Sequence, residues 1–399
     1  MKRIFVPVLM TLPFAAMAQD TAEEDRGWLE GIIEDNLSAA GRQVNIVGFE
    51  GALSSRATLQ ELTIADDDGV WLTLRGVALD WSRTALLRGA LEVEELTAEE
   101  IVVARAPLPA EGLEAAPSPE ATPFALPELP VSINIGRLAA ERVELGAPLM
   151  GESVVASLEA SAALSGGEGN VTLSANRTDG QPLSIALSAG YGNETRELAL
   201  ELNLTEGANG LVTRSIGLPG APAIELTVAG TGPIDDYRAD IQLATDDQPR
   251  LTGAVTLNGS EAGQGFAANL QGDIAPLFLP DYAEFFGPDI ALNVEGTRGT
   301  DGVLDLPTLS LTSRALALNG AVTIGADGLP DRIAMTGRIA DPDGGPVLLP
   351  LSTERTLLDS ADLDVAFDAA QSEDWRAKIR VTNLDRDDFD AETLVLDGT

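Results

Sequence analysis

The chain has 399 residues, of which 63 are acidic and 25 are basic, giving a formal net charge of −38. This charge opposes binding to nucleic-acid backbones and to anionic lipid headgroups, so no nucleic-acid partner is expected. Cysteine and histidine are both absent, which excludes disulfides, thiolate nucleophiles, the commonest zinc ligand and the usual general base. The sequence also carries neither a Gly-x-Ser-x-Gly elbow nor a phosphate-binding loop. We therefore expect no enzyme, no cofactor and no catalytic residue.

The first 18 residues have the pattern of an export signal. Lys2 and Arg3 precede an apolar stretch at 4–15, and Ala16-Met17-Ala18 matches the small-x-small cleavage pattern. The alternative is an uncleaved anchor in the inner membrane, although the stretch is shorter than the roughly 20 residues that span a bilayer. Under either interpretation, the body of the protein is expected in the periplasm of a Gram-negative bacterium.

An amphipathic helix is predicted at 25–40. Its apolar residues recur at helical spacing, and Gly41 follows as a C-cap. These residues are Trp28, Leu29, Ile32, Ile33 and Leu37. The helix is expected either to cap the first strands or to close one end of a groove. Its acidic polar face argues against a place on an anionic membrane.

Short strands follow this helix. They are expected at 44–49, 58–64, 70–74, 77–81, 91–93 and 101–104, with a single helical turn at 82–87. Seven prolines between 107 and 130 exclude a sheet ladder there and predict a linker or loop. The predicted organisation is a signal or anchor at 1–18, a first module at 19–106, the linker at 107–130 and an extended β-repeat region at 131–399.

From about residue 183 onward, apolar and polar residues alternate with a period of two, which gives each strand one apolar and one polar side. Turn signals separate the runs at 166–167, 179–180, 230–232, 258–259, 301–302, 319–320, 327–328 and 343–344. The absence of helical patterns between them predicts an all-β fold. Two architectures remain open: a sandwich or barrel with a closed core, and a folded-over sheet whose apolar groove stays partly open.

In the groove interpretation, the inward-facing residues form the lining. They are Leu198, Leu200, Leu202, Leu226, Leu257, Leu292, Leu318 and Val365. Aspartate clusters at 66–68, 341–343 and 385–390 are interpreted as solvated turns. Calcium binding is the alternative, although none of them has the spacing of a known calcium loop. Trp71 and Trp81 are expected to pack in the first sheet rather than to form a ligand platform.

The segment 66–107 resembles the N-terminal region of TamB-like proteins, the translocation and assembly module subunits of the AsmA-like group. The resemblance rests on Asp68-Gly69-Val70-Trp71-Leu72, Leu79-Asp80-Trp81-Ser82, Ala85-Leu86-Leu87-Arg88-Gly89, Leu96-Thr97-Ala98 and Arg105-Ala106-Pro107. The segments 129–146 and 232–243 are similar to that family as well. The resemblance implies an elongated β-groove, of the kind called a β-taco, between the inner and outer membranes. Relatives are longer and carry a further C-terminal domain, so the chain is expected to be the N-terminal part of a longer protein.

The expected function is a lipid conduit that supports outer-membrane biogenesis by passing phospholipid along the groove. The resemblance implies a TamA-type outer-membrane β-barrel as partner, and contact with the inner membrane if the N-terminus is uncleaved. The alternative is a scaffold or chaperone that offers strand edges to outer-membrane proteins by β-augmentation. The sequence leaves open the identity of the cargo lipid, the direction of transport and the oligomeric state.

Overall fold

The computed structural model describes residues 43–51, 56–108, 126, 131–260, 263–277, 282–350, 355–371, 374–387 and 389–398. The predicted signal at 1–18, the helix at 25–40 and most of the linker at 107–130 lie outside these residues. In the described part, strands predominate and every helix is short, which confirms the all-β fold class. The chain divides into two compact units. The first holds the described residues up to 108 together with 131–159, and the second holds residue 126 and the described residues from 160 onward.

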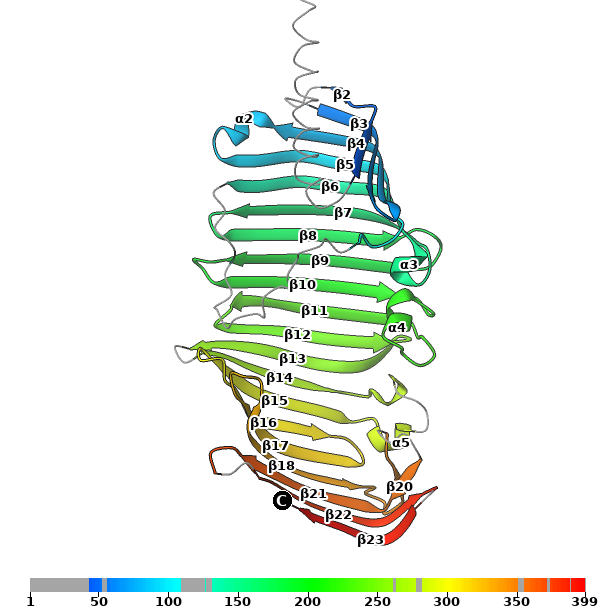
Figure 1. Ribbon diagram of the computed structural model, residues 1–399, viewed down its shortest axis with the longest axis vertical. Coiled ribbons are helices and arrows are strands. Elements are labelled where there is room, and N and C mark those ends of the chain that lie inside the picture. Colours follow the sequence, from blue (N-terminus) through cyan, green and yellow to red (C-terminus); the bar gives the residue numbers. More distant parts are fainter. Residues whose placement is uncertain are drawn as a thin grey trace, which may run out of the picture. The chain divides into compact units, whose positions relative to one another are not determined.

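The first unit is a sheet with two short helices at the ends of its strands (Figure 1). Its elements are β1 (Gln43–Val47), β2 (Glu50–Gly51), β3 (Arg56–Asp66), β4 (Gly69–Ser82), α2 (Arg83–Leu86), β5 (Ala90–Val103), β6 (Ser132–Leu145) and α3 (Ala147–Met150). β1, β2 and β4 pair antiparallel with β3, and β5 pairs antiparallel with β4. β6 pairs with β5 in parallel. Parallel neighbours need a crossover rather than a hairpin, and the segment 104–131 supplies that connection.

The strands of the first unit are longer than the sequence pattern predicts. β4 is one continuous strand where the sequence pattern predicts two, at 70–74 and 77–81. Gly76 has φ +57°, a left-handed conformation that glycine adopts without steric cost, so the strand passes through this point as an irregularity instead of ending. β5 likewise joins the predicted strands at 91–93 and 101–104. The predicted helical turn after β4 is present as α2.

The second unit is a sheet of consecutive antiparallel strands, drawn from green to red in Figure 1. Its strands are β8 (Glu168–Arg177), β9 (Leu183–Gly192), β10 (Glu197–Glu206), β11 (Ile224–Pro233), β12 (Asp236–Thr245), β13 (Gln248–Ser260), β14 (Gly263–Gly272), β15 (Ile290–Gly299), β16 (Leu304–Thr312), β17 (Leu316–Ile324), β18 (Pro330–Ala340), β19 (Val347–Leu348), β20 (Thr356–Leu358), β21 (Ser360–Asp368), β22 (Trp375–Arg386) and β23 (Phe389–Gly398). The helices are α4 (Leu211–Ser215), η1 (Ala275–Leu277) and α5 (Ala283–Phe286). β7 (Val154–Ser165) has residues in both units.

Each strand from β8 to β18 pairs with the next one along the chain, and β18 then pairs with β21, which continues through β22 to β23. The short strands β19 and β20 pair with each other, and β20 also pairs with β22. Within the described residues, β23 pairs only with β22.

Three of the predicted turns lie inside strands. Gly230, Gly259 and Gly320 belong to β11, β13 and β17. Two of these glycines make room for the next strand: a Cβ on Gly230 would lie 2.6 Å from the hydroxyl oxygen of Tyr237, and one on Gly320 would lie 2.7 Å from Cγ of Met335. The sequence signal for a turn here marks a close approach between strands, which is another common reason for a strand glycine. The other five predicted turns connect strands as expected.

Candidate functional site

The apolar side chains of the second unit gather on one face of its sheet. Residues directly opposite each other in an antiparallel pair point to the same face. Leu202 on β10 lies opposite Leu187 on β9 and Val228 on β11. The same register continues across the whole sheet and defines the central row: Leu173, Leu187, Leu202, Val228, Ile241, Gly253, Leu270, Leu292, Leu311, Leu318, Gly337, Leu363, Ile379 and Leu396. Each strand of β8–β18 and β21–β23 contributes one residue to this row.

Parallel rows flank the central row on the same face, because side chains two residues apart on a strand point the same way. One of them runs through Leu200, Gly230, Ala239, Val255, Ala268, Val294, Leu309, Gly320, Met335, Val365 and Ala377. We call these rows together the apolar face. All eight residues predicted as the groove lining lie on it: Leu198, Leu200, Leu202, Leu226, Leu257, Leu292, Leu318 and Val365. Their contact with lipid remains a prediction.

The two faces of this sheet differ in polarity and in exposure. The eight predicted lining residues are all half-buried. On the opposite face, Glu201, Thr227 and Asn293 alternate with them and are exposed. A closed sandwich would bury the apolar side chains almost completely. Half-burial indicates that neighbouring side chains cover part of each residue and leave the rest of it accessible.

One margin of the apolar face is closed by a local core. Next to the central row runs a row through Leu316, Ile339, Ala361, Val381 and Leu394. Phe285 of α5, Val347 of β19 and Leu358 of β20 pack against it and are buried, with Leu358 only 2% exposed. The short elements α5, β19 and β20 thus cover the ends of strands β17, β18 and β21–β23 and leave the central row partly exposed.

A buried hydroxyl interrupts the apolar face on β12. Tyr237 is 5% exposed, and its hydroxyl finds no hydrogen-bond partner among the described residues. Burial raises the pKa of this phenol above its ordinary value, because the phenolate would lose its hydration. The hydroxyl therefore stays neutral and lies beside Gly230, whose lack of a side chain provides the space.

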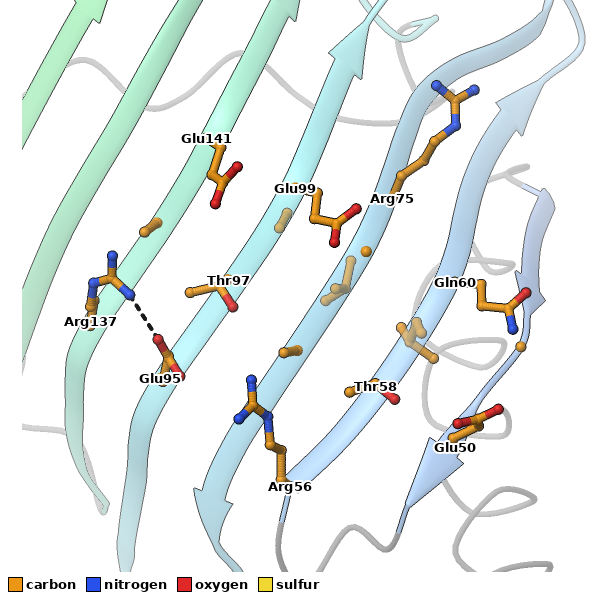
Figure 2. A pocket seen from close by; sticks show the side chains of 17 residues that line it. Glu50, Arg56, Thr58, Gln60, Arg75, Glu95, Thr97, Glu99, Arg137 and Glu141 are labelled. Carbon is orange, nitrogen blue, oxygen red and sulfur yellow. Dashed lines mark hydrogen bonds and ion pairs between the residues drawn. The ribbon is translucent and has the colours of Figure 1, made fainter.

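The first unit carries a polar trough that crosses strands β3–β6. Its floor is a row of small residues in register: Thr58, Ala78, Thr97 and Ala139. Two residues away, one wall holds Arg56 and the ion-paired Glu95 and Arg137, whose Oε1 and Nη1 atoms are 2.8 Å apart. The other wall holds Gln60, Gly76, Glu99 and Glu141. The trough encloses about 760 Å³, and Figure 2 shows these side chains from β3 to β6 around it.

The second wall of the trough coincides with an interruption of the sheet pairing. Between β3 and β4, the register passes from Leu59↔Val77 to Glu61↔Arg75 and leaves out the level of Gln60 and Gly76. Between β5 and β6, it likewise leaves out Glu99 and Glu141. The irregularities are thus aligned across four strands. A Cβ on Gly76 would lie 2.5 Å from the Glu99 side chain, so Glu99 occupies space that only glycine leaves open.

A chain of ion pairs borders this wall. Arg75 lies between Glu61, at 3.1 Å from Nε to Oε2, and Glu100 on β5. Arg142 on β6 contacts Glu100 through Nε at 3.0 Å and Glu144 through Nη2 at 2.6 Å. The hydrogen bond from Arg75, supported by the one from Arg142, holds the pKa of Glu100 below its usual value against the opposing effect of burial. These charges are already compensated, which distinguishes them from the carboxylates on the trough wall.

In two of the three aspartate clusters, at 66–68 and 341–343, aspartates have cationic or backbone partners. Asp66 accepts hydrogen bonds from Arg105 and from the backbone N–H groups of Asp68 and Leu108. Arg314 pairs with Asp341 at 3.3 Å and with Asp343 at 2.7 Å. The described residues contain no group of three or more acidic side chains arranged to hold a metal ion.

Sequence reasoning found the apolar face and missed the trough. The signal for the trough lies in four pairs of adjacent polar residues or glycine, one in each of strands β3–β6: Gln60-Glu61, Arg75-Gly76, Glu99-Glu100 and Glu141-Arg142. Each pair breaks the alternation of period two. Their alignment depends on the sheet register. The prolines at 107–130 mark the connection as a linker, but they do not show that β6 lies parallel to β5.

No protein-family model, curated protein or solved structure matches the chain. The resemblance to TamB-like proteins is therefore untested and remains a sequence-based prediction. Over the described ranges, every helix is too short to cross a bilayer.

Proposed function

We propose that this chain binds the acyl chains of phospholipids along the apolar face of its second unit and acts as a conduit for them in the periplasm. The observation that carries the proposal is the central row, which crosses every strand of β8–β18 and β21–β23 with apolar side chains or glycine. These strands number fourteen. At a spacing of about 4.8 Å, the row spans roughly 60 Å, about twice the hydrocarbon thickness of a bilayer. More than one lipid fits along it.

Acyl chains would be held on the apolar face by the hydrophobic effect alone. Each methylene that leaves water contributes about 0.8 kcal/mol, so an acyl chain is retained only where the lining is continuous. The lining here has glycines but no charged residue in the central row. Half-buried leucines offer accessible apolar surface, and a surface of this extent is typical of a ligand-binding or interaction site. Headgroups would stay in water beside the exposed polar margins.

The passage of phospholipid between inner and outer membranes, and the TamA-type β-barrel partner, enter this proposal only through the sequence resemblance. They define the context in which such a conduit supports outer-membrane biogenesis. Acyl-chain binding can be tested without them.

A substitution pair on the apolar face tests this function. The full chain is exported to a bacterial periplasm, purified, and examined by native mass spectrometry and lipid extraction. The wild type is expected to retain phospholipid at one or more molecules per chain. Leu202→Asp/Leu292→Asp places two charges in the central row and is expected to reduce the retained lipid at least tenfold.

The matched control is Thr227→Asp/Asn293→Asp, which adds the same side chains to the exposed polar face of the same sheet. It is expected to retain lipid as the wild type does. Circular dichroism checks that both variants fold. A folded wild type that carries no lipid, or equal retention in the two variants, contradicts the proposal.

A second candidate function is β-augmentation, favoured by the exposed apolar side chains of β23, which pairs only with β22 within the described residues. Val395 and Leu396 on this strand are each 51% exposed. An exposed apolar edge strand is a template for pairing with another strand. Photo-cross-linking from position 395 distinguishes the two functions: capture of unfolded outer-membrane protein supports the scaffold, and capture of lipid alone argues against it.

A further inference from the structure

The polar trough of the first unit contains exposed charged side chains that have no ion-pair partner among the described residues. Arg56 forms no ion pair within the described part of the chain, and the same holds for Glu99 and Glu141. By contrast, Arg137 pairs with Glu95 and Glu159, and Arg75 pairs with Glu61 and Glu100. Arg56 therefore remains at one wall of the trough and Glu99 and Glu141 remain at the other, while Glu50 of β2 adds a further carboxylate to the lining (Figure 2).

The arrangement of these charges selects a dipolar ligand. Arg56 and Glu99 are separated by two strand spacings and by four residues along the strand, which places their Cα atoms roughly 16 Å apart. Their long side chains extend over a floor of small residues, Thr58, Ala78, Thr97 and Ala139. The space left between the guanidinium and the carboxylates suits a small molecule with a negative and a positive end.

The chemistry of each end follows from the side chains. A guanidinium presents a planar fork of donors that matches phosphate oxygens. An ammonium group donates three hydrogen bonds. The carboxylates of Glu99 and Glu141 and the hydroxyl of Thr97 can accept them. Two carboxylates fall short of the larger ligand set that a calcium ion requires.

The net charge of the chain strengthens this selection. At −38, the protein repels simple anions, so a lone phosphate ester has little reason to bind near Arg56. An attached amine reverses this repulsion at the glutamate wall. We propose that the trough binds a zwitterionic phosphate ester that carries a primary amine, with the phosphate at Arg56 and the ammonium group between Glu99 and Glu141.

This proposal does not depend on acyl-chain binding, because the trough lies in the first unit and the apolar face lies in the second. Two sources supply the same chemistry: a soluble phosphoethanolamine ester and the headgroup of phosphatidylethanolamine. Calorimetry on the full chain with glycerophosphoethanolamine, which has no acyl chains, tests the trough alone. Titration with nanodiscs of phosphatidylethanolamine then shows whether the headgroup in a membrane is also bound.

Glycerophosphoethanolamine is expected to bind at least tenfold more tightly than either glycerol 3-phosphate or ethanolamine, each of which has only one of the two charges. Arg56→Gln and Glu99→Gln/Glu141→Gln are each expected to weaken its binding about tenfold or more, the loss of a charge-assisted contact. If glycerophosphoethanolamine binds tightly and the trough variants weaken its binding, the proposal is supported whether or not the nanodiscs bind.

The controls remove matched charges from exposed strand positions of the second unit. Arg332→Gln is the control for the arginine variant, and Glu225→Gln/Glu295→Gln is the control for the double glutamate variant. Both are expected to bind as the wild type does. The proposal is overturned if the trough variants bind like these controls, if glycerophosphoethanolamine does not bind, or if ethanolamine alone binds equally well, which would indicate a simple cation site.

Discussion

The guanidinium of Arg105 forms a hydrogen-bonded ion pair with the carboxylate of Asp66. Its Nη1 atom donates to Oδ2 at 2.9 Å, and its Nη2 atom pairs with Oδ1 and also donates to the carbonyl oxygen of Gly69 at 2.7 Å. The backbone N–H of Leu108 adds a fourth contact at 2.9 Å. These bonds tie the segment after β5 to the turn between β3 and β4, at the start of the crossover that leads to β6. The aspartate cluster at 66–68 thus has a structural role in the sheet.

This pair predicts an acid-sensitive contribution to the stability of the first unit. The hydrogen bond from Arg105, with the backbone N–H groups, holds the pKa of Asp66 well below its usual value of 3.8, although burial opposes the shift. A carboxyl whose pKa is lower in the folded state stabilises that state above its unfolded pKa and loses the effect as pH falls. Arg105→Gln is expected to lower the melting temperature at pH 7 and nearly as much at pH 3, because the Asp66 carboxyl of the folded protein is still ionised at that pH. The difference from the wild type is expected to shrink only in stronger acid, as the pH falls through the pKa of Asp66 in the folded state.

Thermal unfolding followed by circular dichroism measures this effect. Arg88→Gln is the control, because Arg88 is exposed and forms no ion pair within the described residues. A difference between the Arg105 variant and the wild type that persists unchanged into acid well below pH 3 would contradict the assignment.

Two leucines of the second unit are expected to respond differently to truncation. Leu358→Ala removes a side chain that is 2% exposed within the core closed by α5 and β19. It is expected to reduce the free energy of unfolding by about 2–5 kcal/mol, the usual cost of a core cavity. Leu318→Ala, on the half-exposed central row, is expected to cost about 1 kcal/mol. Urea unfolding measures both, and equal losses would show that the apolar face is as closed as the core.

Removing the buried hydroxyl of Tyr237 is expected to stabilise the protein. A buried hydroxyl without a partner costs about 1–3 kcal/mol, so Tyr237→Phe is expected to raise the free energy of unfolding by about 1 kcal/mol. Tyr282→Phe, at a half-buried position near α5, serves as the control and is expected to change it by less than about 0.5 kcal/mol. Urea unfolding of both variants provides the measurement. A loss of stability in the Tyr237 variant would show that the hydroxyl has a partner in solution.

The single pairing of β23 among the described strands predicts uneven protection of backbone amides. Strand β12 has a pairing partner on each side, whereas β23 has one. Hydrogen exchange measured by mass spectrometry is expected to be at least tenfold faster in Phe389–Gly398 than in Asp236–Thr245, because edge amides that point away from β22 are open to solvent. Equal protection of the two strands would mean that another strand covers this edge.

Much of the second unit followed from local sequence. The alternation of leucine with polar residues in β10 fixes which side chains share a face, since the period of a strand is two. All eight residues predicted for the lining lie on the apolar face for this reason. The turn signals were less reliable: Gly230 and Gly320 lie inside strands, where they face Tyr237 and Met335. The sequence alone does not distinguish a glycine that allows two strands to approach closely from a glycine that forms a turn.

The sequence by itself determined the all-β class, the acidic charge and the apolar side of each strand, because these depend only on composition and on neighbours along the chain. The tertiary structure alone decided which strands pair and in which register. It thereby aligned Leu202 with Leu292 and Leu318 in one row, and brought Arg56 of β3 to the same trough as Glu141 of β6. Such contacts join residues far apart in the chain, and strand alternation contains no information about which strand will lie beside which.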